Sequence, residues 1–150
     1  MINNTNKLAS ILNTKSHPID APKYRSKCKS ILDRDGVLVL KKFLLKESIQ
    51  SILEEAKQQE GLAYYCVNEH NVYLDPYDNN YPNSHPRNRT VVSSKGCITD
   101  DQVPKDSALR ALYDSEKFRD FLCSVLDEKA LYKYDDNLSS INIHYANEGH

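Results

Sequence analysis

The chain has 150 residues, of which 39% are apolar, and a formal net charge of -1 from 20 basic and 21 acidic side chains. With this balance no large positive field favours binding to nucleic acid or an anionic membrane, and no apolar stretch approaches the roughly 20 residues needed to span a bilayer. The N-terminus, MINNTNKLASILNTK, lacks the basic-then-apolar build of a signal peptide, so we expect a cytoplasmic protein.

Residues 1–20 are polar and predict a partly mobile N-terminal arm. The apolar exceptions form one cluster, expected to make a small helix that docks on the body: Leu8, Ile11 and Leu12. Residues 21–36 then predict a helix, with Pro22 in its first turn and Gly36 as its stop.

The next segments predict a strand followed by a helix. Residues 37–43, VLVLKKF, are short, rich in Val and Leu and preceded by Gly, which favours a strand. Residues 46–61 have the spacing of an amphipathic helix that ends at Gly61. Its expected buried stripe comprises Ile49, Ile52, Leu53 and Ala56.

The middle of the chain predicts β-structure around a long loop. Residues 62–67, LAYYCV, read as a strand, and residues 72–74, VYL, as its hairpin partner. Residues 75–89 contain three Pro and many Asn and Asp, so they predict a loop, and a loop of this length is often functional. Residues 90–98 predict another strand, weakened near its end by Gly96.

The last third predicts two helices and two strands. Ser107 and Ser115 are the expected N-caps of consecutive helices. Residues 131–134, LYKY, predict a short strand, and residues 139–150 an alternating strand. In that alternation one face carries Ile141, Ile143 and Tyr145, and the other carries Asn142 and His144.

Complete catalytic or metal-binding motifs are absent from the sequence. None of the five His is followed two positions later by Asp or Glu, so the His-x-carboxylate half of a facial iron triad is missing, and we expect no metal ligand among these residues. The four cysteines are widely spaced and form no CxxC, which argues against zinc and disulfides and favours buried or half-buried thiols: Cys28, Cys66, Cys97 and Cys123.

The order of short sequence words resembles a family of enzymes. The words are DGVLVL and FL at 35–44, HPRNR at 85–89, DQVP at 101–104, SALRALY at 107–113, and LYKY with LSSIN at 131–142. In this order they are similar to Fe(II)/2-oxoglutarate-dependent oxygenases, in particular the bacterial HalD/BesD-like and ArpA-like group. The resemblance covers most of the chain, from about Ile31 to His150.

The resemblance implies an α+β fold: the N-terminal helices and first strands of a double-stranded β-helix, or jelly roll. Residues 21–150 would form the N-terminal portion of that oxygenase domain. The implied activity is hydroxylation, or halogenation, of a C–H bond in a small polar substrate, of which an amino acid is one candidate. The implied cofactors are Fe(II) and 2-oxoglutarate. In the family the last strand leads into His-x-Asp or His-x-Gly, and this sequence stops just short of that motif, with His150 at a turn position.

Six residues are candidates for the pocket. Asn142 and His144 are expected to contact 2-oxoglutarate, substrate or a nearby water, although a solvent-facing polar strand explains them equally. Asn142 matches the family's Asn, whereas His144 replaces an apolar residue. The substrate candidates are Arg87 and Arg89, as a carboxylate clamp or as surface Arg, and Tyr132 and Tyr134, as hydroxyl donors or as packing at the core edge.

A non-enzymatic hypothesis stays open beside the oxygenase. It describes a non-catalytic cytosolic α+β module that binds a partner or small ligand and needs no metal, or a truncated pseudo-enzyme. Its weakness is the alternating final strand, which would be left with an exposed apolar edge.

Overall fold

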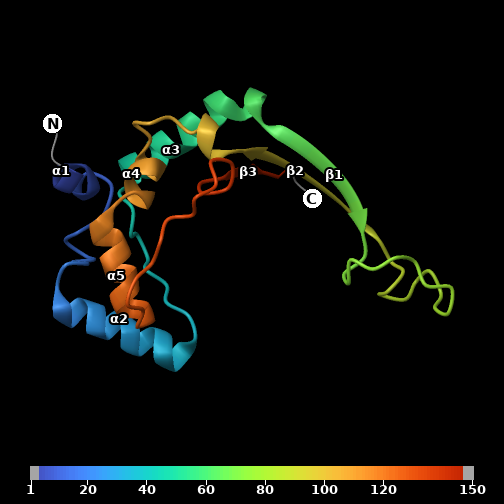
Figure 1. Ribbon diagram of the computed structural model, residues 1–150, viewed down its shortest axis with the longest axis horizontal. Helices are drawn as coiled ribbons and strands as arrows, with labels where there is room; N and C mark the ends of the chain where they lie inside the picture. The colour runs from blue at the N-terminus through green and yellow to red at the C-terminus, as the bar shows by residue number, and fades with distance from the viewer. Residues whose placement is uncertain (1–3, 147–150) are drawn as a thin grey trace. The chain divides into compact units, whose positions relative to one another are not determined.

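The computed structural model describes residues 4–146, and it is a mixed α+β structure (Figure 1). Its contacts divide the chain into two compact units. That residues 21–150 are the N-terminal portion of an oxygenase domain stays a prediction. The helical unit comprises Met1–Gln58 and Thr99–Ile141, and the sheet unit comprises Gln59–Ile98 and Asn142–His150. Each unit is described by itself.

The helical unit contains five α-helices and a short 3-10 turn within the described residues: α1 (Asn4–Ala9), α2 (Pro22–Asp35), α3 (Lys46–Gln59), η2 (Asp100–Gln102), α4 (Ala108–Tyr113) and α5 (Glu116–Leu126). Gly36 ends α2 with φ 69°, and its N–H donates to the Leu32 carbonyl, as a glycine stop should. The hydroxyls of Ser107 and Ser115 accept from the Leu109 and Phe118 amides. These predicted helix ends are confirmed.

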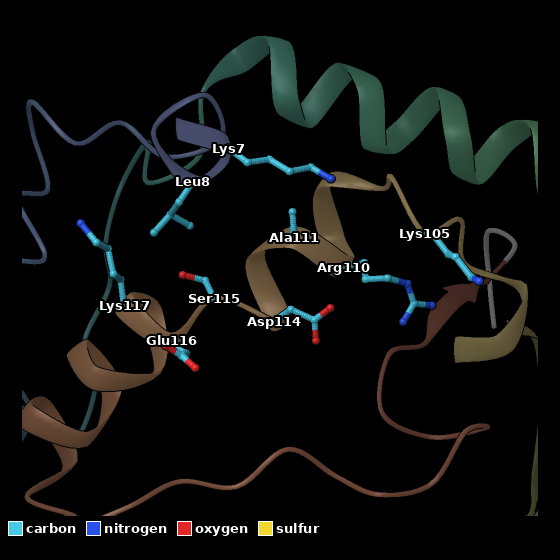
Figure 2. Close-up of a pocket in the computed structure, with 9 residues that line it drawn as sticks. All are labelled: Lys7, Leu8, Lys105, Arg110, Ala111, Asp114, Ser115, Glu116 and Lys117. Carbon is cyan, nitrogen blue, oxygen red and sulfur yellow. The ribbon is translucent and has the colours of Figure 1, made fainter. Parts of the chain in front are cut away.

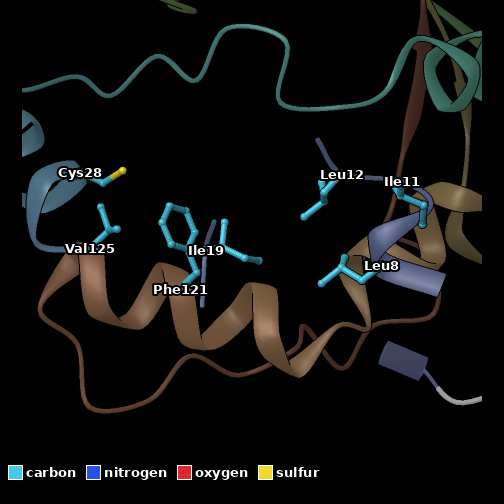
Figure 3. Packing of buried hydrophobic residues seen from close by; sticks show 7 residues of the cluster. All are labelled: Leu8, Ile11, Leu12, Ile19, Cys28, Phe121 and Val125. Carbon is cyan, nitrogen blue, oxygen red and sulfur yellow. The ribbon is translucent and has the colours of Figure 1, made fainter. Parts of the chain in front are cut away.

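The core of the helical unit lies between α2, α5 and the N-terminal segment (Figure 3). Its buried members are Leu8, Ile11, Leu12, Ile19, Cys28, Phe121 and Val125. The short helix and docked apolar cluster predicted near the N-terminus are therefore confirmed. Phe121 is 1% exposed, and its ring stacks on those of Tyr24 and Phe118 at centroid distances of 6.1 and 6.4 Å.

His17 is a buried structural residue. Its Nδ1 lies 2.6 Å from the Tyr24 hydroxyl, and its Nε2 lies 3.0 Å from the Lys41 carbonyl. Because a carbonyl only accepts, we assign the proton to Nε2, and Nδ1 then accepts from Tyr24. Burial, and next the neighbouring Cys28, raise the pKa of Tyr24 to about 12, so its hydroxyl keeps its proton for this bond.

The strand predicted at residues 37–43 is wrong. The segment is extended and alternates, with Leu38 and Leu40 half-buried against the core and Val39 69% exposed, but no neighbouring strand pairs with it. Lys42 turns the chain with φ 57°, and only an isolated bridge between Leu12 and Leu44 follows.

The predicted amphipathic helix at residues 46–61 exists as α3, but its stripe is not buried as expected. Ile49 is 44% exposed and Leu53 is 50% exposed. Within the described chain the buried residue of α3 is Ser48, whose hydroxyl donates to the Ser10 carbonyl at 3.1 Å. The apolar face of α3 is therefore partly open.

The sheet unit is a three-stranded antiparallel sheet in the order β1-β2-β3. Its elements are η1 (Glu60–Leu62), β1 (Tyr64–His70), β2 (Val91–Ile98) and β3 (Ile143–Tyr145). The strand predicted at 90–98 is confirmed as β2. The hairpin predicted at 72–74 is wrong, because β1 continues to His70 and pairs with β2.

Two further strand predictions need correction. Residues 131–134 form no strand, and the Tyr134 amide donates instead to the Tyr113 hydroxyl at 2.8 Å. The final strand is much shorter than the predicted 139–150, although residues 147–150 lie outside the described part of the chain.

Gly96 explains how β2 accommodates an aromatic neighbour. Tyr65 is its cross-strand partner, and a Cβ on Gly96 would lie 2.7 Å from the Tyr65 ring. The glycine therefore makes room for the Tyr65 ring, a pairing known to compensate a glycine in a strand. What looked like a weak point in the sequence is a packing requirement.

Candidate functional site

The third strand presents different chemistry on its two faces. His144 is exposed and lies opposite Cys97, which lies opposite Tyr64, so these three side chains form one row across the sheet. Ile143 and Tyr145 are half-buried on the other face, where Ile143 pairs with the fully buried Ile98. The alternation predicted for these three residues of β3 is confirmed.

Asn142 lies directly before β3 and is exposed. It precedes His144 by two residues and also takes part in an interaction of its own. The structure thus places both predicted cofactor contacts at the start of β3, where a ligand could reach them. Whether they bind 2-oxoglutarate stays a prediction.

The loop between β1 and β2 is organised by a buried asparagine. Asn71 is 3% exposed, and its Nδ2 donates to the Asp75 and Arg87 carbonyls at 2.7 and 2.6 Å. Its Oδ1 accepts from the Tyr73 and Asp75 amides at 3.0 and 3.2 Å. All four hydrogen-bonding positions of the side chain are therefore used to hold the loop.

Asn88 does the same further along the loop. It is 6% exposed, and its Nδ2 donates to the Asp78 and Tyr81 carbonyls, both at 2.8 Å. Its Oδ1 accepts from the Asp78 amide at 2.9 Å. Sequence reasoning predicted the loop but missed these two residues; the available signal was the tendency of Asn to bond backbone groups a few residues away.

Arg87 is already paired within this loop. Its guanidinium lies 3.1 Å from Asp78 and 3.5 Å from Asp75, and 5.9 Å from the centre of the Tyr81 ring. The pKa of Asp78 is lowered first by the Asn80 amide, which donates to it, and also by Arg87. A substrate carboxylate would have to displace two carboxylates from Arg87.

Arg89 is exposed, and its amide donates to the His85 carbonyl at 2.8 Å. Both arginines lie at the loop end of the β1–β2 ribbon, beyond the His70–Val91 pair (Figure 1). His144 pairs with Cys97, six residues along β2 from Val91, which is about 20 Å at ~3.3 Å per residue. The structure therefore does not bring the arginines together with the β3 candidates.

Tyr132 and Tyr134 belong to the helical unit, in the extended segment after α5. Tyr132 is 91% exposed and Tyr134 is 65% exposed. Tyr132 lines a small pocket of about 210 Å³ beside α5. Packing at the core edge, the alternative explanation for these tyrosines, does not hold for side chains this exposed.

A larger pocket of about 390 Å³ lies between α1, α4 and α5 (Figure 2). Arg110 lines it, but its guanidinium is bound to the Val103 and Pro104 carbonyls at 2.9 and 3.3 Å and lies 3.0 Å from Asp100. Asp114 is paired with Lys133 at 2.8 Å, and Lys117 with Asp20 at 3.1 Å. Three of the six charged residues that line it are therefore paired within the chain, and none of the six predicted site residues lines it.

The described side chains do not gather into an iron site. Among residues 4–146 no three His, Cys, Asp or Glu residues gather closely enough to hold a metal ion. The side chains beside His144 across the sheet are Cys97 and Tyr64. A facial triad would need a second His and a carboxylate there. No helix in the part of the chain that the structure describes is both long and apolar enough to cross a membrane.

No protein-family model, curated protein or solved structure matches this chain.

Proposed function

We propose that this chain is the N-terminal portion of an Fe(II)/2-oxoglutarate-dependent oxygenase, and that its β3 strand forms one wall of the active-site pocket. The observation that carries the proposal is the two-sided character of the sheet at β3. One face has the buried Ile98, and the other carries the exposed Tyr64 and His144 with the half-buried Cys97 between them. An open polar face on an antiparallel sheet suits a jelly roll, whose second sheet would cover it.

The chain's own residues would then bind and orient small molecules. Asn142 offers an amide that donates and accepts, and His144 an imidazole, both of which suit a carboxylate or a bound water. Iron supplies oxygen activation when it is bound, and the ligands that hold it would lie in sequence beyond His150. Hydroxylation is the default outcome on a small polar substrate, and halogenation requires an iron position left open for halide.

The reading frame tests this directly. We expect the frame that encodes these residues to continue past His150 into His-x-Asp for a hydroxylase or His-x-Gly for a halogenase. A frame that continues without either motif, or that stops at once, would overturn the proposal.

In the protein encoded by the complete reading frame, Asn142→Ala should raise KM for 2-oxoglutarate or for the substrate by about two- to tenfold. This is the effect of one lost hydrogen bond. Asn137→Ala is the matched control, because Asn137 is also exposed but precedes the strand by several residues. Steady-state kinetics in both substrates provide the measurement. Equal KM values for Asn142→Ala and the parent protein would reject a pocket role for Asn142.

A second candidate is a non-catalytic binding module, favoured by the apolar surface of the sheet. Val67 is 65% exposed, Val92 is 52% exposed, and the two lie on the same face as Tyr65. Such a surface marks a place where another layer or partner packs. The reading frame separates the two candidates, because only the oxygenase requires the iron motif.

A further inference from the structure

The pocket of about 210 Å³ beside α5 has an apolar floor. Phe118 and Leu122 from α5 and Leu131 from the following segment line it, and all three are half-buried. Phe118 is held in place by Phe43, whose ring centre lies 5.7 Å away. The floor is therefore an extension of the core that the side chains of the described residues leave partly open.

Three polar side chains also line the pocket, and two of them already have a partner within the chain: Tyr113, Arg119 and Lys133. Lys133 is paired with Asp114 at 2.8 Å, and the Tyr113 hydroxyl accepts the Tyr134 amide at 2.8 Å. Arg119 is half-buried and also lines the pocket. Among residues 4–146 no ion pair or side-chain hydrogen bond involves its guanidinium. A half-buried cation beside an apolar floor lacks the counter-charge that such a group normally has.

Tyr132 completes the pocket from the solvent side. Its ring is 91% exposed although it borders the apolar floor. A ligand lying on Phe118 and Leu122 would give this ring a stacking partner. The volume equals that of about seven liquid waters, which leaves room for one aromatic ring and a short acid chain.

We propose that this pocket binds a small free carboxylic acid with an aromatic body, whose carboxylate pairs with Arg119 and whose ring lies between Tyr132 and the apolar floor. Arg suits this role because its planar fork binds both oxygens of a carboxylate. The proposal uses residues of the helical unit alone and does not depend on the oxygenase proposal.

The test compares 3-phenylpropionate with the neutral 3-phenylpropan-1-ol, titrated into the 150-residue chain and followed by amide chemical shifts. We expect the acid to bind with Kd on the order of 1 mM, as a ligand of this size should. The alcohol should bind about tenfold more weakly because it lacks the charge-assisted pair. Shifts should centre on α5 and on residues 131–133.

Variants assign the two contacts. Arg119→Gln should remove the preference for the acid, whereas Lys117→Gln, which takes one positive charge from the same helix outside this pocket, should keep it. Tyr132→Ala should weaken binding of the acid and of the alcohol alike by about three- to tenfold. Because Tyr132 is exposed, this substitution should not disturb folding. The proposal is overturned if the acid shows no saturable binding, if acid and alcohol bind equally, or if Arg119→Gln behaves like Lys117→Gln.

Discussion

Phe121→Ala is expected to lower the free energy of unfolding of the helical unit by about 3–5 kcal/mol. Phe121 is 1% exposed and its ring packs on those of Tyr24 and Phe118. Alanine would remove that contact area and leave a cavity that the helices α2 and α5 cannot close without moving. Since whole domains are stable by only about 5–15 kcal/mol, this single change should bring the unit close to unfolding.

Tyr132→Ala is the matched control for this prediction. It also removes an aromatic ring from the same unit, but a ring that is 91% exposed, so the change should stay within about 0.5 kcal/mol. Urea unfolding monitored through amide resonances of α5 reports on the helical unit separately from the sheet. Equal losses for the two variants would mean that Phe121 is not the centre of this core.

Asn71→Asp should release the loop between β1 and β2 with almost no change in side-chain size. The variant replaces the Nδ2 donor with an oxygen that faces the Asp75 and Arg87 carbonyls, so two hydrogen bonds become repulsive contacts. Two lost bonds and the repulsion cost roughly 2 kcal/mol or more, which corresponds to at least about a 30-fold rise in opening of the loop. Trypsin cleavage after Arg89 measures that opening.

Asn79→Asp provides the control, because Asn79 lies exposed in the same loop and the substitution makes the same change in charge. We expect its cleavage rate to match that of the parent chain. If Asn71→Asp is cleaved no faster than Asn79→Asp, the four bonds of Asn71 do not hold the loop.

Local signals predicted the helices well. Gly36 ends α2, and Ser107 and Ser115 cap α4 and α5, because caps depend on groups within a turn of the helix end. Strands were predicted less well, since a strand exists only where another strand pairs with it. Residues 37–40 alternate like a strand but pair with no other described strand. In residues 131–134 the Tyr134 amide donates to the Tyr113 hydroxyl instead of to a strand.

The site was predictable to a smaller extent. Alternation on β3 correctly put His144 and Ile143 on opposite faces, because strand period alone decides this. Sequence could not show that Arg87 is paired with Asp75 and Asp78, because this depends on how the long loop folds back on itself. Nor could it show that Arg119 borders a pocket, because this depends on how the segment after α5 packs.

Succinate formation from 2-oxoglutarate by the product of the whole reading frame tests the central claim most directly. With Fe(II), O2 and 2-oxoglutarate we expect succinate to accumulate, and we expect a chelator to abolish it. The 150-residue chain alone should form none, since its described residues do not gather an iron ligand set. The account is contradicted if the whole product forms no more succinate than the iron-free control, or if the 150-residue chain turns over 2-oxoglutarate by itself.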